Sequence, residues 1–323
     1  MTSHPSRADQ HDIHPNLTEE QRALLREWLP GLTIIQNHSW GTIETTVLEA
    51  TAPSPTATGT ATATTTATTT DTATGRYIIK AGGPSDHHMA REIHAYNNWA
   101  SAWRPGVDAP KPLKSHKNAK LLVTEYLDGT LVQGHVAEQD PDTYRQAGAL
   151  LRRFHDQHRE PHPDYELKEN RKLLRLLEQP HRIPADHVAH LRGTVPNWPN
   201  QPATIVPTHG DWQPRNWLIH EGNMRVIDFG RAALRPNYTD LVRLQFQQFA
   251  TVPGSEAAFL DGYGRDPREP ESWYREQVRQ AVATAVWAFG VGDEPFELAG
   301  RAHLTRLLAS RPGEASIAVV PYI

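Results

Sequence analysis

Two short stretches of the sequence hold polar residues whose types and spacing could do chemistry. Residues 208–216 read Thr-His-Gly-Asp-Trp-Gln-Pro-Arg-Asn, and residues 226–230 read Val-Ile-Asp-Phe-Gly. Phosphoryl transfer needs one carboxylate that faces the attacking hydroxyl group and two oxygen-bearing side chains that hold Mg²⁺ against nucleotide phosphates. Asp211 can supply the first group, and Asn216 and Asp228 can supply the other two. The two stretches therefore indicate a site for phosphoryl transfer.

The elements around these residues are suited to position them. The four residues between Asp211 and Asn216 make a short loop, which can place both side chains around one cleft. Two apolar runs follow, at 217–220 and 224–228, and residues 221–223 join them. Such a pattern predicts a β-hairpin. Asp228 ends this hairpin, so we expect the hairpin to return Asp228 to the loop.

This arrangement resembles the aminoglycoside phosphotransferase family, a branch of the protein-kinase-like superfamily. The family's loop reads His-Gly-Asp-x-x-x-x-Asn and is followed by Ile-Asp-Phe or Ile-Asp-Trp, and this sequence matches it at His209, Asp211, Asn216 and 227–229. The alternative is a polar loop capped by an ordinary buried aspartate; the loop, strand, turn and strand around the motif favour the functional interpretation. The resemblance covers about residues 30–310. It implies an α+β, bilobal protein-kinase-like fold, with an N-terminal antiparallel β-sheet lobe with helices and a larger, mainly helical C-terminal lobe.

The resemblance also implies roles for the loop residues. Asp211 would orient the acceptor hydroxyl group and take its proton, and His209 would fix the loop by hydrogen bonding. Asn216 and Asp228 would hold Mg²⁺. Arg215 would contact phosphate or substrate, with an exposed salt bridge as the alternative. The phosphoryl donor implied is ATP, and GTP stays open because the nucleotide loop is sparse in glycine.

The N-terminal half holds residues in the order that the superfamily uses. Lys80 ends an expected strand at 76–80 and would contact nucleotide phosphates, and Glu92, on an expected helix at 85–99, would orient it. A solvated strand end and a surface charge are the alternatives for these two residues. Trp40 and Gly41 lie between expected strands at 32–37 and 45–50, where the family has its nucleotide loop, although an ordinary hairpin turn would look the same.

The segment that would join the two lobes follows an apolar strand at 120–126. Glu125 and Leu127 would hold the adenine there, mainly through main-chain groups; a plain strand end predicts the same sequence. Further along, His155 ends the apolar stripe of a helix that Asp140 and Pro141 begin, and we expect it to pack or cap. Asp240 lies in the first turn of a later helix and is interpreted as a structural cap.

Composition sets the class of the protein and its boundaries. The 323 residues carry a net charge of −4 and no cysteine, which argues against a nucleic-acid or membrane partner and excludes disulfides and Cys-ligated zinc. No apolar run could span a bilayer, so we expect a cytoplasmic protein. We expect it to be a monomer or a homodimer. The expected parts are a disordered tail at 1–16, the nucleotide-binding lobe at 17–128 with a disordered Thr/Ala-rich insertion at 51–74, the catalytic lobe at 129–310 and a tail at 311–323.

The acceptor is the open part of the prediction. The family implies a small hydroxylated and cationic molecule, an aminoglycoside or similar basic antibiotic, and carboxylates would then line its cleft. The acidic candidates lie in the last helices at Asp261, Asp293, Glu294 and Glu297. The first alternative is a metabolic kinase that acts on choline, a sugar or an amino acid. The second is a kinase-like module that binds nucleotide without catalysis, although all four of Lys80, Asp211, Asn216 and Asp228 are present.

Overall fold

The computed structural model describes residues 13–39, 45–53 and 74–310 of the chain. The expectations for residues 1–12, for Trp40 and Gly41, for the Thr/Ala-rich stretch 54–73 and for residues 311–323 lie outside that part. The chain divides into two compact units. Unit 1 comprises residues 1–128 and 225–231, and unit 2 comprises residues 129–224 and 232–323.

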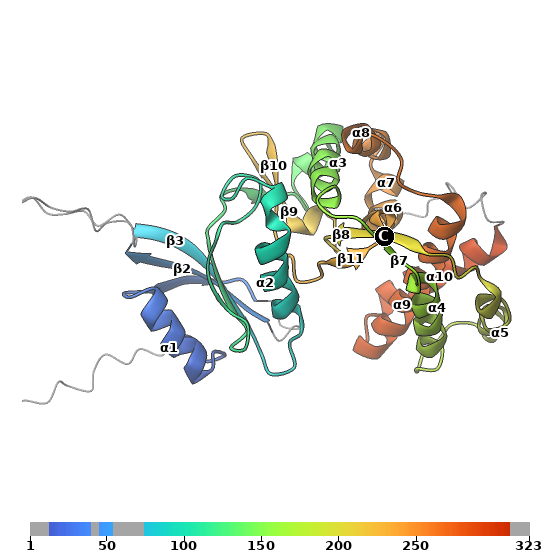
Figure 1. Ribbon diagram of the computed structural model, residues 1–323, viewed down its shortest axis with the longest axis horizontal. Coiled ribbons are helices and arrows are strands. Elements are labelled where there is room, and N and C mark those ends of the chain that lie inside the picture. The colour runs from blue at the N-terminus through green and yellow to red at the C-terminus, as the bar shows by residue number, and fades with distance from the viewer. Residues whose placement is uncertain (1–12, 40–44, 54–73, 311–323) are drawn as a thin grey trace, which may run out of the picture. The chain divides into compact units, whose positions relative to one another are not determined.

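Unit 1 is built on an antiparallel sheet whose strand order is β1-β2-β3-β5-β4 in the described part of the chain. Figure 1 labels β2 and β3 of this sheet. Thr18 and Gln21 have the spacing of a capping box in the sequence, and the structure forms it: the Thr18 hydroxyl accepts the Gln21 N–H and the Gln21 side chain accepts the Thr18 N–H. The elements of this unit are α1 (Glu19–Trp28), β1 (Thr33–Asn37), β2 (Thr45–Pro53), β3 (Thr74–Gly82), α2 (His88–Asn98), the 3₁₀ turn η2 (Ala100–Ala102), β4 (Pro112–His116) and β5 (Leu121–Glu125).

The side chains of β3 alternate between the apolar core of unit 1 and the opposite face of the sheet, where Lys80 lies. One face of the strand is buried and packs in the same apolar cluster as α1, through Tyr77, Ile79 and Ala81. Successive side chains of a strand point to opposite faces of the sheet. Lys80 therefore lies on the other face, where it bonds Glu92 of α2. Because β3 is paired with β2 on one side and β5 on the other, the backbone of Lys80 is held on both sides.

Unit 2 is mainly helical, and with the sheet of unit 1 it confirms the predicted α+β class. β8 pairs with β7 and β11, and β9 pairs with β6, all antiparallel. Its elements are β6 (Thr130–Leu131), η3 (Val136–Gln139), α3 (Pro141–His155), β7 (Glu160–His162), α4 (Tyr165–Leu176), α5 (Ala185–Thr194), η4 (Val195–Asn197), β8 (Ala203–Thr208), η5 (Pro214–Asn216), β9 (Trp217–His220), β11 (Ala233–Arg235), η6 (Asn237–Leu241), α6 (Val242–Phe246), α7 (Gln248–Thr251), α8 (Ser255–Tyr263), α9 (Pro270–Val291) and α10 (Glu294–Ala309).

The hairpin predicted after the polar loop is formed by β9 and β10 (Asn223–Val226), which are neighbours in one sheet. Glu221 and Gly222 join the two strands with φ angles of 50° and 74°. Two successive residues with positive φ make the type of tight turn that matches the twist of an antiparallel pair. The chain thereby passes from unit 2 into unit 1 within β10 and reaches Asp228 two residues later.

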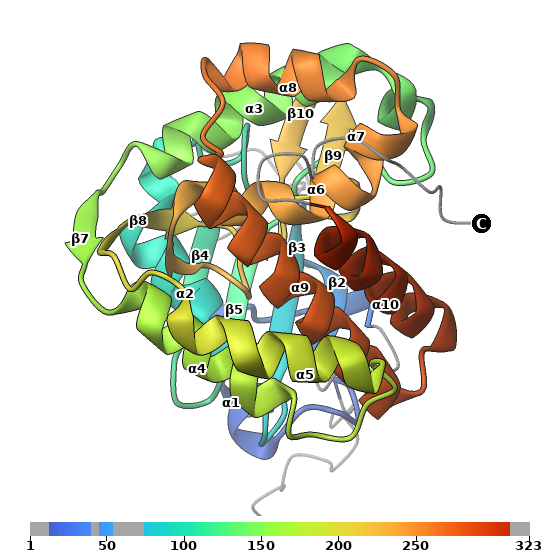
Figure 2. The same ribbon diagram turned by 90° about the vertical axis from the view of Figure 1, so that its right-hand side faces the viewer.

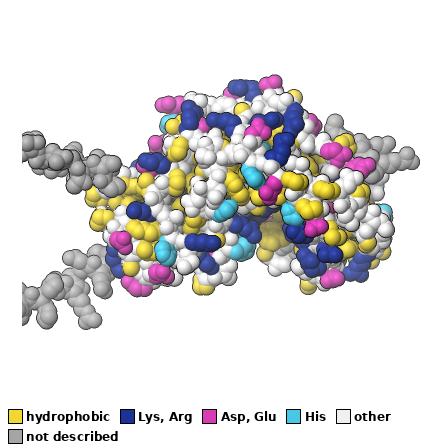
Figure 3. Space-filling view, in the orientation of Figure 1, with side chains coloured by type: hydrophobic (Ala, Val, Ile, Leu, Met, Phe, Trp, Pro, Cys, Tyr) yellow, Lys and Arg dark blue, Asp and Glu magenta, His cyan; other side chains and the backbone are white. Residues whose placement is uncertain are grey.

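One hydrophobic core of unit 2 lies between helices of residues 165–309. α9 packs beside α10 and α4 (Figure 2). Their buried apolar side chains form one cluster together with those of α5 and η4, and this cluster includes Leu173, Leu191, Val195, Val282, Ala285 and Leu304. Within the described residues, no helix is both long enough and apolar enough to cross a bilayer. Figure 3 shows basic and acidic side chains interspersed over the face in view.

The backbones of α3 and α8 lie in direct contact, and glycine residues at the contact make this possible. A Cβ atom on Gly148 of α3 would lie 2.1 Å from the carbonyl oxygen of Phe259, and one on Gly262 of α8 would lie 1.9 Å from the carbonyl oxygen of Arg145. Carbon and oxygen atoms cannot come that close, so any other residue at either position forces the helices apart.

We expect Gly148→Ala to lower the free energy of unfolding by about 1–3 kcal/mol, because α3 and α8 must separate to admit the methyl group. Denaturant titration of the purified protein measures this. Gly193→Ala on α5 is the matched control, since a Cβ atom there meets nothing within 4 Å. That change should raise the free energy of unfolding by about 0.5–1 kcal/mol through the better helix propensity of alanine. Equal effects of the two substitutions would contradict the close approach.

His303 on α10 makes the stability of unit 2 depend on pH. Its ring stacks at a tilt on Phe246 of α6, with ring centroids 3.7 Å apart. Burial, and after it the charge of Arg306, lowers the pKa of His303 from 6.5 to about 3. Between those two pH values the unfolded chain binds a proton at this residue that the folded chain does not.

The free energy of unfolding should therefore fall as pH decreases below 6.5, by up to about 1.4 kcal/mol per pH unit from this residue. His303→Leu should remove that contribution, so the loss of stability between pH 7.5 and 5.0 should be about 2 kcal/mol smaller than in the wild type. Denaturant titrations at the two pH values measure the difference. His190→Leu at an exposed position of α5 is the control and should retain the wild-type pH dependence.

Candidate active site

The lysine of β3 lies between two carboxyl groups of unit 1. Lys80 Nζ is 2.7 Å from Glu92 Oε1 and 3.2 Å from Asp228 Oδ1. Burial alone would lower the pKa of Lys80, but the charges of Asp228 and Glu92 outweigh it and hold that pKa above its ordinary value. Burial also raises the pKa of Glu92, against the effect of Lys80. The structure therefore brings together these three predicted residues, with more carboxyl groups than cations.

The backbone that carries Asp228 is held in an unusual conformation. Its φ is 67°, in the left-handed region, which costs about 1–3 kcal/mol for a residue other than glycine. The next residue, Phe229, is buried, with ring centroids 5.0 Å from Tyr96 and 5.2 Å from Trp103. One residue further, the carbonyl oxygen of Gly230 lies 3.0 Å from His88 Nδ1. The contacts of the two residues that follow Asp228 thus offset the strain and fix the direction of the Asp228 carboxylate.

The second polar group lies in unit 2, around Asp211. Its side chain is only 5% exposed, and Oδ2 accepts a hydrogen bond from Arg215 Nη2 at 2.6 Å. Oδ1 accepts from the Gln213 side-chain amide and lies 3.0 Å from Arg243 Nη1. Asn216 Nδ2 donates to the Asp211 carbonyl oxygen at 2.8 Å. This bond uses only the amide nitrogen of Asn216, so its amide oxygen keeps its capacity as a ligand.

A buried carboxylate holds the backbone of this loop. Asp240 Oδ2 accepts the N–H of His209 at 2.8 Å, and Oδ1 accepts the N–H of Gly210 at 2.6 Å. The same carboxylate bonds His155 Nε2 at 3.0 Å, and His155 Nδ1 lies 2.8 Å from the Tyr263 hydroxyl. Burial alone would raise the pKa of Asp240, but the His155 hydrogen bond, the nearby His charges and the Gly210 N–H together lower it. The carboxylate is therefore ionised at neutral pH and aligns two successive backbone groups of the loop.

The expectation that Asp240 caps its own helix is wrong. Within the described residues, its helix, η6, has no side-chain cap, and Asp240 instead bonds the loop some 30 residues earlier in the chain. Tertiary packing explains the difference, because the buried carboxylate accepts N–H groups of the loop rather than N–H groups of its own helix. His155 is packed and hydrogen-bonded in the same network, which agrees with the packing role expected of it.

Aromatic packing supports the loop from within. Trp212 and Trp217 are both fully buried, with ring centroids 5.7 Å apart. His209 meets Trp212 edge-to-face at 5.3 Å, and Tyr144 of α3 meets Trp217 at 5.8 Å. Trp212 and Trp217 thus anchor the loop in the core on either side of Arg215, and Trp212 directly follows Asp211.

The remaining predicted residues make local contacts, and these contacts indicate no role in the site. The Glu125 N–H donates to the Lys111 carbonyl oxygen, its carboxylate pairs with Lys111 at 2.7 Å, and Leu127 is buried. Asp261 is exposed on α8. The acidic residues of α10 are used locally: Asp293 caps the helix by accepting the Phe296 N–H, and Glu294 and Glu297 both pair with Arg182.

The donor set expected for Mg²⁺ consists of the Asp228 carboxylate and the Asn216 amide oxygen. Oxygen donors of this kind suit a hard divalent cation. Asp228 is 48% exposed on its side chain and can take an incoming ion in place of its contact with Lys80. In the described part of the chain, no three His, Asp or Glu side chains converge as a metal-binding group. The chemistry of the two residues therefore fits magnesium, with further ligands left to phosphate and water.

Arg243 and Gln213 were not identified as site residues from the sequence. Gln213 lies within the loop itself, and its amide nitrogen donates to Asp211. Arg243 comes from α6, outside the motif, and contacts Asp211 from there. The sequence offers one signal for Arg243: it follows Asp240 by three residues, which is about one helical turn, so the two side chains can lie on the same side of a helix.

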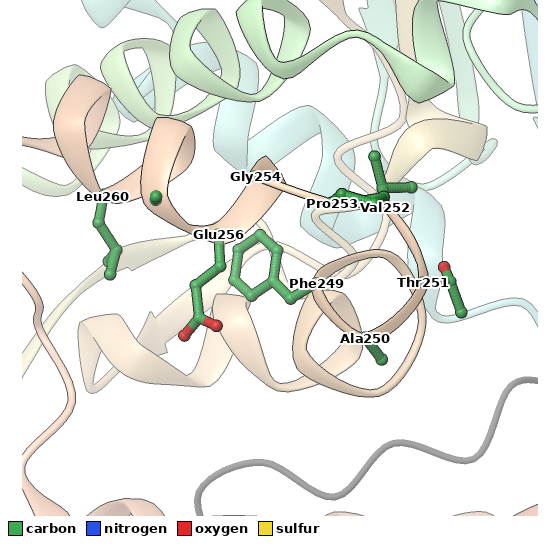
Figure 4. A pocket seen from close by; sticks show the side chains of 9 residues that line it. Phe249, Ala250, Thr251, Val252, Pro253, Gly254, Glu256 and Leu260 are labelled. Carbon is green, nitrogen blue, oxygen red and sulfur yellow. The ribbon is translucent and has the colours of Figure 1, made fainter.

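A pocket in unit 2 lies between α7 and α8 and does not contain the Asp211 group (Figure 4). Glu256 is its one ionisable lining residue, and this carboxylate pairs with Arg268 at 2.6 Å. The pocket therefore offers no group for phosphoryl transfer. Its lining consists of Phe249, Ala250, Thr251, Val252, Pro253, Gly254, Glu256, Ala257 and Leu260.

Comparison with known proteins gives a family and a fold. The sequence matches the model of the phosphotransferase enzyme family over residues 58–279. No curated protein matches the sequence.

Similar solved structures include the streptomycin–ATP ternary complex of APH(2")-IIa, at 14% identity, with 94% of this chain and 100% of that chain covered and a TM-score of 0.60. A choline kinase from Streptococcus pneumoniae has 15% identity, 90% and 98% coverage and a TM-score of 0.60. A macrolide 2'-phosphotransferase from Brachybacterium faecium has 17% identity, 89% and 98% coverage and a TM-score of 0.57. The predicted kinase-like fold is confirmed.

The hydrogen-bond network of Asp240, His155 and Tyr263 predicts that substitutions closer to the loop cost more stability. Tyr263→Phe should lower the free energy of unfolding by about 1–2 kcal/mol, because it removes the buried hydrogen bond to His155 and the one that Asn237 Nδ2 donates to the hydroxyl group. Asp240→Asn should cost about 2–4 kcal/mol, because the loop N–H groups and His155 lose an ionised acceptor. Tyr274→Phe is the control, since no hydrogen bond of its hydroxyl is recorded in the described part of the chain. Denaturant titration measures all three, and an Asp240→Asn protein as stable as the control would contradict this role.

Proposed function

The chain belongs to the phosphotransferase enzyme family, and from that premise we propose that it transfers the γ-phosphoryl group of ATP to a hydroxyl group of a small molecule. The observation that carries the proposal is the group of Lys80, Glu92 and Asp228 in unit 1, with nitrogen–oxygen distances of 2.7 and 3.2 Å. A lysine fixed by a helix glutamate and adjacent to a metal-binding aspartate is the arrangement that kinases use to grip nucleotide phosphates.

Asp211 is the proposed catalytic base. The acceptor oxygen forms a bond to the γ-phosphorus while the bond from that phosphorus to the leaving diphosphate breaks, and the hydroxyl proton passes to the Asp211 carboxylate. Because the transition state is loose, the proton moves late and a strong base is not needed. The position of Asp211 matters more, and Gln213, Arg215 and Arg243 hold its two oxygens. His209 contributes through its N–H, which fixes the loop on Asp240.

The proposed roles of the remaining polar residues concern charge. Lys80 binds the nucleotide phosphates, and Arg215 stabilises charge on the transferred group. Asn216 and Asp228 would hold Mg²⁺, which supplies neutralisation of the phosphate oxygens when it is bound. ATP is favoured as the donor because the similar APH(2")-IIa forms a ternary complex with it, and GTP is the alternative. Glu125 and Leu127 are the proposed adenine contacts.

The acceptor class follows from the family by analogy. An aminoglycoside or a similar basic antibiotic is the first class to test, which would make the biological role antibiotic resistance. The alternative is a metabolic acceptor such as choline, a sugar or an amino acid, in line with the choline kinase among the similar structures. A module that binds nucleotide without transfer is disfavoured, because the ion pair of Lys80 and the Asp211 loop are both formed.

The test is nucleotide turnover with Mg²⁺-ATP across aminoglycosides, peptide antibiotics, choline, sugars and amino acids. Asp211→Asn should lower kcat for the accepted compound by about 10²–10⁴-fold with little change in nucleotide affinity, because it removes the base and keeps the side-chain shape. Lys80→Met should instead weaken nucleotide binding. Removal of Mg²⁺ with a chelator should stop transfer, and added Mg²⁺ should restore it.

Asp186→Asn, at an exposed position in the first turn of α5, is the matched control and should keep full turnover. Circular dichroism of each variant shows whether its fold is retained. Nucleotide binding without transfer to any compound, or full turnover by a folded Asp211→Asn protein, would contradict the proposed reaction.

A further inference from the structure

Arg268 contacts three helices of unit 2. It lies in the stretch between α8 and α9, and its side chain is 12% exposed. Asp266, two residues earlier, holds the guanidinium group with both carboxylate oxygens: Nε lies 2.8 Å from Oδ1, and Nη2 lies 2.7 Å from Oδ2. Such a paired contact fixes the plane of a guanidinium group as well as its position. The third nitrogen, Nη1, is therefore held in a defined direction.

The Nη1 atom of Arg268 bonds two of these helices. It lies 2.6 Å from Gln245 Oε1 on α6 and 2.6 Å from Glu256 Oε1 on α8. The guanidinium carbon also lies 5.6 Å from the ring centroid of Trp273 on α9. Trp273 in turn meets Tyr238 of η6 edge-to-face, with ring centroids 6.4 Å apart. Arg268 thus reaches α6 directly and η6 through one aromatic ring.

The helices η6 and α6 form one segment, residues 237–246, that holds the candidate loop. Each helix has only five residues, and within the described residues neither has a side-chain cap. Helices of that length are not stable by themselves. Asp240 of this segment accepts two backbone N–H groups of the loop, and Arg243 Nη1 lies 3.0 Å from Asp211 Oδ1. The position of the η6–α6 segment therefore affects the position of Asp211.

Apolar packing holds the η6–α6 segment against the core but leaves its rotation less defined, because apolar contacts are not directional. The buried apolar side chains of the segment include Leu241, Val242 and Leu244. A hydrogen bond, in contrast, depends on direction. Successive residues of a helix are about 100° apart, so Gln245 lies about 200° from Arg243 around α6. The bond from Arg268 therefore holds α6 on the side opposite to Arg243 and opposes rotation of the helix.

We propose that Arg268 is a positioning residue for phosphoryl transfer: its hydrogen bond to Gln245 fixes the η6–α6 segment, and the segment fixes the Asp211 loop. The inference rests on the proposed phosphotransferase function. Positioning of this kind acts on kcat, because the base and the hydroxyl group must be aligned in the transition state, and a shift of about 1 Å can cost about 10²-fold. The affinity for ATP depends on Lys80 in unit 1 and should not change.

The test separates the bond to α6 from the bond to α8 in the full-length protein. Gln245→Met removes the acceptor on α6 and keeps the length of the side chain, whereas Gln245→Glu keeps an acceptor there. Arg268→Lys cannot make the paired contact with Asp266. Glu256→Met is the matched control, because it removes the other acceptor of the same nitrogen on α8. Denaturant titration shows whether each variant folds and whether the two methionine variants lose similar stability.

Two measurements are made on each protein. Phosphoryl transfer is measured with Mg²⁺-ATP and the compound that the wild type accepts, and hydrogen exchange of residues 208–216 is measured by mass spectrometry without any ligand. Gln245→Met should lower kcat about 5- to 20-fold with the KM for ATP unchanged. It should also speed exchange at His209 and Gly210 about 3- to 10-fold, as expected for the loss of one hydrogen bond.

The other variants complete the comparison. Arg268→Lys should lower kcat at least as far as Gln245→Met, and Gln245→Glu and Glu256→Met should both retain wild-type kcat and exchange. Equal losses in Gln245→Met and Glu256→Met, or wild-type values in Gln245→Met, would overturn the proposal. If the wild type transfers phosphate to no compound, the proposed reaction is contradicted, and exchange at His209 and Gly210 in the two methionine variants still decides whether Arg268 positions the loop.

Discussion

The buried carboxylate of Asp240 joins the parts of unit 2 on which the candidate loop depends. Two of its hydrogen bonds align successive N–H groups of the loop, and a third reaches His155 at the end of α3, which in turn contacts Tyr263 at the end of α8. A buried carboxylate is stable only when such partners stay in place. The near-contact of α3 and α8, which Gly148 and Gly262 allow, therefore helps to set the position of Asp211 as well as the packing of the helices.

The two polar groups hold their central residues in different ways. In unit 1, one lysine faces two carboxyl groups, and the more exposed of them, Asp228, is held by a strained backbone. Such a group gains from a further cation. In unit 2, the Asp211 carboxylate lies within hydrogen-bond distance of Arg215 and Arg243, which hold its two oxygens in place.

The sequence predicted local features of the structure, but it did not predict which side chains contact residues far away in the chain. The capping box of Thr18 and Gln21, the hairpin around Gly222 and the order from Lys80 to Asp228 depend on neighbouring residues or on a contiguous motif. Asp240 was misread because the direction of its carboxylate is set by tertiary packing against a loop that precedes it by 30 residues. Arg243 was missed for the same reason. The roles of the site residues stay predictions, and those of Trp40 and Gly41 concern residues outside the described part.

The return of the chain to unit 1 at residues 225–231 has a consequence for folding during synthesis. Asp228 follows its partner Lys80 by 148 residues, and Phe229, which packs on Tyr96 and Trp103, comes equally late. A ribosome that has made only residues 1–128 has therefore released a sheet whose lysine lacks one carboxylate and whose aromatic cluster lacks one ring. Although domains generally fold in order from the N-terminus, this unit cannot complete its packing until residues 129–224 of the other unit have also been translated.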